Sequence, residues 1–126
     1  MIESVSAIVF TILTGIVVVF QGCLAAGMPW GAASMGGKYP GKYPPKMRIV
    51  AIINMIILSF TAAIVLSQSG LLFPQLKSIS TIGIWFVVVF YGIGTVLNTI
   101  TRSKIERIWA PVVLVQVITS IIVAIN

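Results

Sequence analysis

Long apolar runs alternate with short polar segments along the whole chain. The four runs cover about residues 4–26, 47–68, 78–100 and 105–125. At about 1.5 Å per residue, each run is long enough as a helix to cross roughly 30 Å of hydrocarbon. The connections are short. The pattern therefore predicts an all-α, integral membrane, four-helix antiparallel bundle, with residues 1–126 forming a single transmembrane domain.

Composition supports a membrane protein over a soluble one. Hydrophobic residues make up 59% of the chain and charged residues only 8%, and the mean hydropathy is +1.14. These values lie outside the range of soluble domains. Because little chain remains outside the helices, the sequence excludes a separate soluble catalytic or nucleic-acid-binding domain within these residues.

Charge is distributed unevenly between the two ends of the predicted bundle. The net charge is +6, and every basic residue except Lys77 falls in or beside the first or the third connection. The positive-inside rule predicts that this end is cytoplasmic and that both termini lie outside. Membrane lipids with anionic headgroups, and not nucleic acid, are the expected partners of the basic residues. The candidate interface residues are Lys38, Tyr39, Lys42, Tyr43, Lys46, Arg48, Arg102, Lys104 and Arg107.

The predicted cytoplasmic loop over residues 27–46 is rich in proline and glycine, which excludes a continuous helix. Trp30, Tyr39 and Tyr43 in this loop are typical of an aromatic belt at the membrane interface. An alternative is that the uncharged segment Met28–Gly37 folds back over the mouth of the bundle as a lid. Irregular backbone at membrane depth is tolerated only where it is buried in protein or lines a wet cavity.

The fourth helix carries a local start signal. Ser103, followed three residues later by Glu106, has the form of a capping box and predicts a helix that begins near Lys104. Pro111 would then lie inside the helix and kink it near residues 106–107. Glu106 is expected to act as a cap and as a charge partner of Arg102, Lys104 or Arg107.

Four carboxamide side chains form the candidate site. One lies in each predicted helix, at an expected depth of about 5 to 14 Å from the cytoplasmic end; they are Gln21, Asn54, Asn98 and Gln116. Such groups are costly in hydrocarbon unless they find partners. They are expected either to bond between helices or to line a cavity that binds a ligand, with chance placement as a third possibility.

Other chemistry has few residues available. The chain has one cysteine and no histidine, so a metal site would need Cys23, the two glutamates and neutral oxygens. We expect no metal, no cofactor and no enzymatic activity, because no histidine, no aspartate and no intramembrane lysine is present to activate a nucleophile. A proton-coupled exporter would need an acidic residue inside the membrane, and no pattern typical of an ion-selectivity filter is found.

Several stretches resemble a group of small four-helix bacterial membrane proteins without an assigned reaction. The resemblance covers nearly the whole chain and implies a bacterial cytoplasmic membrane protein. A fainter similarity to emopamil-binding-type bundles, at the small-Trp-Gly stretch and the aromatic-Pro start of the fourth helix, implies a bundle able to bind an apolar ligand. The stretches that carry the first resemblance are Ala25–Gly31, Gly36–Gly37, Pro44–Ile49, Leu97–Ser103 and Glu106–Val112.

Three functional hypotheses follow. The first is a noncatalytic membrane protein whose cytoplasm-facing polar cluster binds a lipid or small molecule through Gln21, Asn54, Asn98 and Gln116, with Trp30 as a lid or wall. The second is an accessory or scaffolding subunit that contacts other membrane proteins. The third is a transporter or channel for small solutes that acts as a homo-oligomer.

Overall fold

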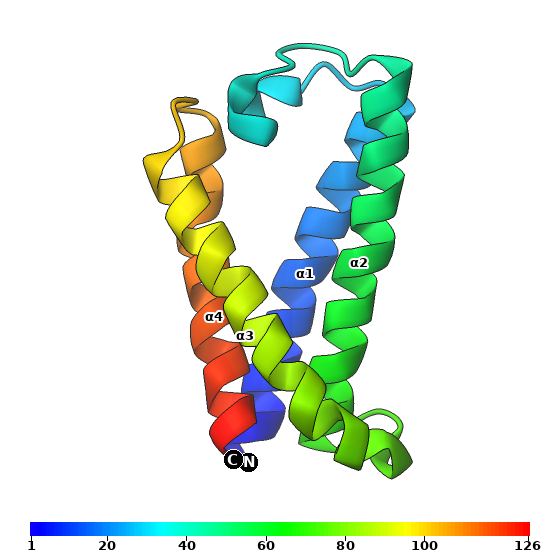
Figure 1. Cartoon of the computed structure of the whole chain (residues 1–126), viewed down its shortest axis with the longest axis vertical. Helices are drawn as coiled ribbons and strands as arrows, with labels where there is room; N and C mark the ends of the chain where they lie inside the picture. Colours follow the sequence, from blue (N-terminus) through cyan, green and yellow to red (C-terminus); the bar gives the residue numbers. More distant parts are fainter.

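Four long helices make up the computed structural model, which describes all 126 residues and contains no β-strand. Successive helices run in opposite directions, both termini lie at one end, and the connection between α1 and α2 lies at the other (Figure 1). The predicted all-helical, four-helix fold is confirmed, and all four helices are long and apolar enough to cross a membrane. Their bounds are α1 Ile2–Ala26, α2 Pro45–Ser69, α3 Lys77–Ile100 and α4 Trp109–Ile125, with short 3₁₀ turns at η1 Gly31–Ala33, η2 Met35–Gly37, η3 Pro74–Leu76 and η4 Glu106–Ile108.

The junction of α1 with its following loop requires a glycine. Gly27 adopts φ 102°, and its N–H group bonds to the carbonyl of Leu24, 3.2 Å away. A Cβ atom at Gly27 would overlap the guanidinium group of Arg48. A cation at the carboxyl end of a helix is favourable because the last carbonyls carry partial negative charge. The loop therefore leaves α1 in a fixed direction, back toward the start of α2.

The predicted start of the fourth helix is wrong. Regular α4 begins at Trp109 and follows the 3₁₀ turn η4. The N–H group of Glu106 does bond to the hydroxyl of Ser103, at 3.3 Å, but the Glu106 carboxylate bonds elsewhere instead of completing the capping box. Pro111 consequently lies in the first turn of α4 and not inside a longer helix. A first-turn N–H group has no partner within the helix, so proline is tolerated there.

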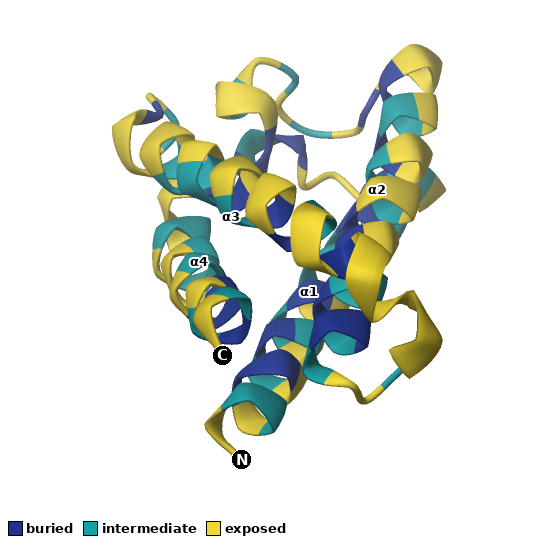
Figure 2. Ribbon diagram, turned by 60° about the horizontal axis from the view of Figure 1, so that its bottom comes forward, coloured by how far each residue is buried: buried dark blue, intermediate teal, exposed yellow.

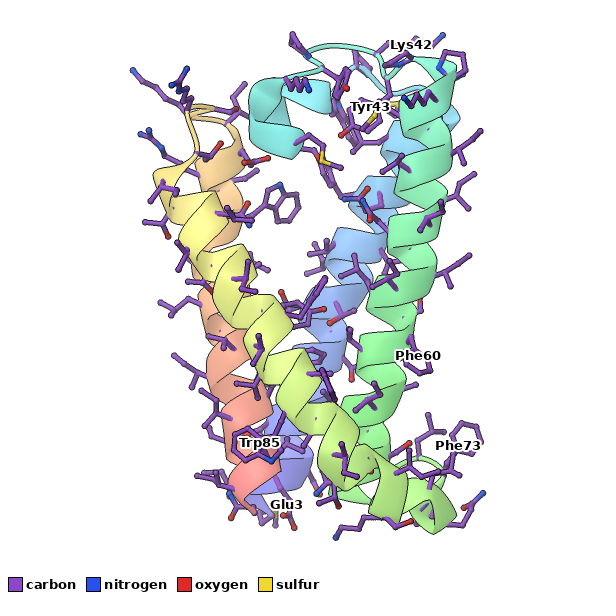
Figure 3. All side chains as sticks on the ribbon, in the orientation of Figure 1. Glu3, Lys42, Tyr43, Phe60, Phe73 and Trp85 are labelled. Atoms are coloured by element: carbon purple, nitrogen blue, oxygen red, sulfur yellow. The ribbon has the colours of Figure 1, made fainter.

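The outer surface of the bundle is apolar. Phe60, Phe73 and Trp85 are exposed, and Phe60 and Phe73 point away from the helices in Figure 3. Exposed residues cover the outer faces of all four helices, while buried residues face inward (Figure 2). Apolar helix faces turned outward are stable in hydrocarbon and costly in water.

Polar side chains join the helices inside. The hydroxyl groups of Thr61 in α2 and Tyr91 in α3 lie 2.9 Å apart. Nearer the connection between α2 and α3, the Ser80 hydroxyl donates to Oε1 of Gln68 at 2.9 Å. Hydrogen bonds between helices, with small residues at the contacts, are the usual means of helix association in lipid.

The apolar core includes different helices at the two ends of the bundle. Near the termini, buried residues of all four helices form one cluster: Ala7, Phe10, Leu58, Val65, Ile84, Val87, Tyr91 and Val123. At the loop end the cluster of Leu24, Tyr43, Met47 and Ala51 belongs only to α1, α2 and the loop. As a result α2 and α3 diverge toward the loop end (Figure 1).

Candidate functional site

A cavity of about 880 Å³ lies where α2 and α3 diverge. All four helices and the loop after α1 contribute to its walls. This volume falls in the range of small-molecule binding sites, roughly 300 to 1,000 Å³. The cavity is therefore the candidate site.

All four predicted carboxamides line this cavity: Gln21, Asn54, Asn98 and Gln116. They do not lie at one depth. Asn98 is two residues from the loop end of α3, whereas Gln116 bonds to Thr14, which is twelve residues before the end of α1. At about 1.5 Å per residue these positions are roughly 3 and 18 Å deep. The carboxamides therefore form a column from the mouth of the cavity inward.

The carboxamides do not pair with one another. Gln116 donates through Nε2 to Oγ1 of Thr14 at 2.9 Å, and Asn98 donates through Nδ2 to the carbonyl of Gly94 in its own helix at 2.7 Å. Oε1 of Gln21 is buried without a hydrogen-bond partner. Of the four, only Gln116 makes a hydrogen bond to another helix, and that bond goes to a hydroxyl group.

The inner end of the cavity is formed by Tyr91 and Gln116, which we call the floor. Both line the cavity; Tyr91 is 3% exposed and Gln116 is fully buried. The ring of Tyr91 packs edge-on against Phe10 of α1, with 5.0 Å between ring centroids. Together with the Thr61 hydrogen bond, this packing joins α1, α2 and α3 below the cavity. The position of the floor is therefore fixed by contacts between helices.

Residues 33–39 cover the outer end of the cavity and are called here the roof segment. Three hydrogen bonds tie this part of the loop to the connection between α3 and α4. The Gly36 N–H group donates to Oε2 of Glu106 at 2.8 Å, and Nε1 of Trp109 donates to the Ala33 carbonyl at 3.0 Å. The Ser103 hydroxyl donates to the carbonyl of Ala32, just before the segment. The loop thus spans the two sides of the cavity.

Glu106 is buried at the cavity wall and does not pair with the neighbouring cations as expected. Its carboxylate accepts the Gly36 N–H group, while Arg107 donates to the Thr101 carbonyl through Nε at 3.1 Å and through Nη2 at 3.0 Å. Glu106 differs from the expectation because the loop brings the backbone N–H group of Gly36, 70 residues away in the sequence, to its carboxylate. Local sequence contains no signal for that contact.

One side of the cavity is apolar and open. Ile57 of α2 and Ile93 and Leu97 of α3 line the cavity and are also exposed on the surface. In a bilayer this side would face the acyl chains, because the exposed faces of α2 and α3 are apolar. The side of the cavity between α2 and α3 is thus lined by apolar side chains that also lie on the outer surface.

The predicted interface residues fall into three groups. Lys38, Tyr39 and Arg102 line the mouth of the cavity, and Lys42 lies at the same end of the bundle (Figure 3). Arg48 lies over the end of α1, and its Nε atom is buried without a hydrogen bond. The remaining basic residues at this end are exposed: Lys46, Lys104 and Arg107.

Two aromatic residues differ from expectation. Trp30 does not line the main cavity but a second hollow beside the α3–α4 connection, with Ile105, Ile108 and Trp109. Tyr43 is only 3% exposed because its ring packs against Leu24, so it does not present its hydroxyl to the interface. Burial raises the pKa of Tyr43 above its usual value of 10.0, and the neighbouring Ser34 side chain opposes part of that rise.

No three side chains among cysteine and glutamate come together in a group suited to hold a metal ion. Cys23 is half-buried in α1 and is a free thiol. The residues gathered at the cavity are amides, hydroxyl groups, apolar side chains and a few charges at the mouth. This set can bind a ligand by hydrogen bonds and apolar contact.

The fold and the cavity define a class of protein: a small helical bundle with four candidate membrane spans and an internal, laterally open site. No family model, curated protein or solved structure matches the chain. The resemblances noted from the sequence therefore stay predictions.

Proposed function

We propose that this chain is an integral protein of a bacterial cytoplasmic membrane that binds a lipid or another amphiphilic small molecule without transforming it. The observation that carries the proposal is the position of Gln21, Asn54, Asn98 and Gln116, which all line one cavity. Apolar ligand sites with a few well-placed polar groups are typical of specific binding. Each carboxamide would contribute a donor, an acceptor or both.

The walls favour an amphiphile over a water-soluble ligand. Lys38 and Arg102 line the mouth and supply positive charge near the expected level of lipid phosphates. Ile57, Ile93 and Leu97 supply an apolar side that faces hydrocarbon. A molecule with a polar part and an apolar part can satisfy both surfaces at once.

The orientation in the membrane follows from the same residues. The basic end, which holds the roof segment, is proposed to face the cytoplasm, and both termini are proposed to lie outside. Support comes from the position of the basic residues at the end opposite the termini (Figure 1).

The proposal is tested by filling the cavity. Gly94 lines the cavity, whereas Gly92, on the same helix, does not. A Cβ atom at either glycine would meet no heavy atom within 4 Å. Gly94→Leu should therefore fill the site without a clash, and Gly92→Leu is a matched control outside it. Both substitutions also remove a helical glycine, which favours the helix by roughly 0.5 to 1 kcal/mol.

Native mass spectrometry of gently extracted protein provides the measurement. Wild-type protein and Gly92→Leu should carry a discrete bound mass, and Gly94→Leu should lose it. A wild-type chain that is always free of bound molecules, or a bound mass retained equally by Gly94→Leu, would contradict binding in this cavity.

A further inference from the structure

One amide hydrogen of Gln116, at the cavity floor, is bonded to Thr14 of α1. The Thr14 hydroxyl donates to the Phe10 carbonyl at 2.8 Å, so its oxygen accepts from Nε2 of Gln116 at 2.9 Å. A hydroxyl group has one hydrogen to donate. The amide orientation of Gln116 is therefore fixed, and its Oε1 atom is left buried without a hydrogen-bond partner.

Tyr91 is constrained in the same way. The Thr61 hydroxyl lies 2.6 Å from the Leu58 carbonyl and 2.9 Å from the Tyr91 hydroxyl. Because the single hydroxyl hydrogen of Thr61 goes to the closer acceptor, Tyr91 donates in its contact with Thr61. The phenolic hydrogen points toward α2, and the lone pairs of the Tyr91 oxygen remain available. The two floor residues thus offer acceptor atoms, and the one donor left at the floor is the second N–H of Gln116.

The residues around Tyr91 and Gln116 carry no charge, which limits the kind of ligand group that can bind at the floor. The two floor residues lie among Phe10, Leu58 and Val113 and have no acidic neighbour, since the one carboxylate of the cavity, Glu106, lies at its mouth. A buried cation without a counter-charge is strongly unfavourable. The floor therefore suits a neutral hydrogen-bond donor.

We propose, on the basis of the proposed function, that the floor is a subsite for the hydroxyl group of a neutral apolar alcohol. The alcohol enters between α2 and α3, places its hydroxyl against Oε1 of Gln116 and the oxygen of Tyr91, and leaves its apolar body against Ile57 and Leu97. A hydroxyl donor satisfies the buried carbonyl of Gln116. An ether or ketone carries only acceptors and leaves it unpaired.

The test compares an alcohol with its methyl ether. Nanodiscs that contain the full chain are incubated with equal amounts of farnesol and farnesyl methyl ether, and retained ligand is quantified by gas chromatography against empty nanodiscs. One lost hydrogen bond to a buried acceptor predicts about tenfold or greater preference for the alcohol. Equal retention of both probes overturns the donor subsite while leaving cavity binding in place.

Three variants test whether the preference for the alcohol over the ether arises at the floor. Gln116→Met removes the buried acceptor and should reduce the preference to about twofold or less, whereas Gln68→Met removes a carboxamide outside the cavity and should preserve it. Thr14→Val frees the Gln116 amide to turn and donate, so the ether should gain binding. A preference unchanged in Gln116→Met overturns the proposal. Failure of both probes to bind above empty nanodiscs, with a native bound mass still present, overturns the alcohol subsite alone.

Discussion

The carboxylate of Glu106 accepts a hydrogen bond of 2.8 Å from the backbone amide of Gly36, although 70 residues separate them. This bond joins the roof segment to the connection between α3 and α4. A hydrogen bond to a carboxylate belongs to the stronger class of hydrogen bonds. It is one of three hydrogen bonds that hold this part of the loop over the cavity mouth.

Removal of this carboxylate should free the roof segment. Hydrogen bonds to charged groups contribute about 1.5 to 3 kcal/mol, so Glu106→Ala should raise amide exchange in residues 33–39 by about tenfold to a hundredfold. Hydrogen exchange followed by mass spectrometry measures this change. Glu3→Ala, at the opposite end of the bundle, is the control (Figure 3). Unchanged exchange in Glu106→Ala would show that other contacts close the mouth.

Gly31 lets two parts of the loop pack closely, because it has no side chain. Its N–H group donates to the Gly41 carbonyl at 2.8 Å, and a Cβ atom added to Gly31 would overlap the Tyr39 carbonyl oxygen. Gly31→Ala should therefore displace the roof segment and increase trypsin cleavage at Lys38 and Lys42. Gly41→Ala is the control for backbone strain, since Gly41 has φ 77° but a Cβ there would contact nothing within 4 Å. Cleavage that is faster in Gly41→Ala than in Gly31→Ala would contradict the crowding argument.

The lengths of the helices were predictable because the thickness of the hydrocarbon sets the length of a spanning helix. Their positions were predictable because the apolar runs mark them in the sequence. Apolar runs placed three of the four helix starts within two residues of their observed positions. The start of α4 was not predictable, since Ser103 and Glu106 form a local capping pattern while the carboxylate is used by Gly36. A tertiary contact outweighed the local signal there.

The candidate site was predictable only in part. One carboxamide per apolar run indicated a shared polar region, and all four residues do line one cavity. Their depths differ because Asn98 lies near the end of α3, whereas Gln116 bonds to Thr14 in the middle of α1. The role of Tyr91 had no sequence signal, since its hydrogen bond to Thr61 joins residues 30 positions apart in the sequence. Trp30 and Tyr43 were misplaced because the fold of the loop depends on Gly31 and Gly36.

Alkaline pH should loosen the loop through Tyr43. Burial raises the pKa of Tyr43 above 10.0, so the neutral phenol is favoured in the folded state. Its contribution to stability is complete below pH 10 and is lost as pH rises through the raised pKa. Hydrogen exchange of residues 38–44 should therefore accelerate above about pH 10.

The matched variant for this prediction is Tyr43→Phe, which keeps the ring in its contact with Leu24 and Met47. The two proteins differ only in the Tyr43 hydroxyl, so the difference between their pH profiles isolates the phenol. Tyr43→Phe should show a smaller alkaline acceleration. Identical profiles above pH 10 would assign the loosening to other groups.

Leucine substitutions at the two asparagines should separate the binding role of the carboxamides from a role in helix association. Asn98 bonds only within its own helix, and Asn54 makes no hydrogen bond to another helix. The variant Asn54→Leu, Asn98→Leu should therefore unfold at or above the wild-type temperature in detergent while losing bound ligand. Gln116→Met breaks the bond to Thr14 and should cost about 0.6 to 2 kcal/mol. If the double asparagine variant is less stable than Gln116→Met, the asparagines stabilise the bundle through contacts between helices, and the column of carboxamides is a structural device instead of a ligand site.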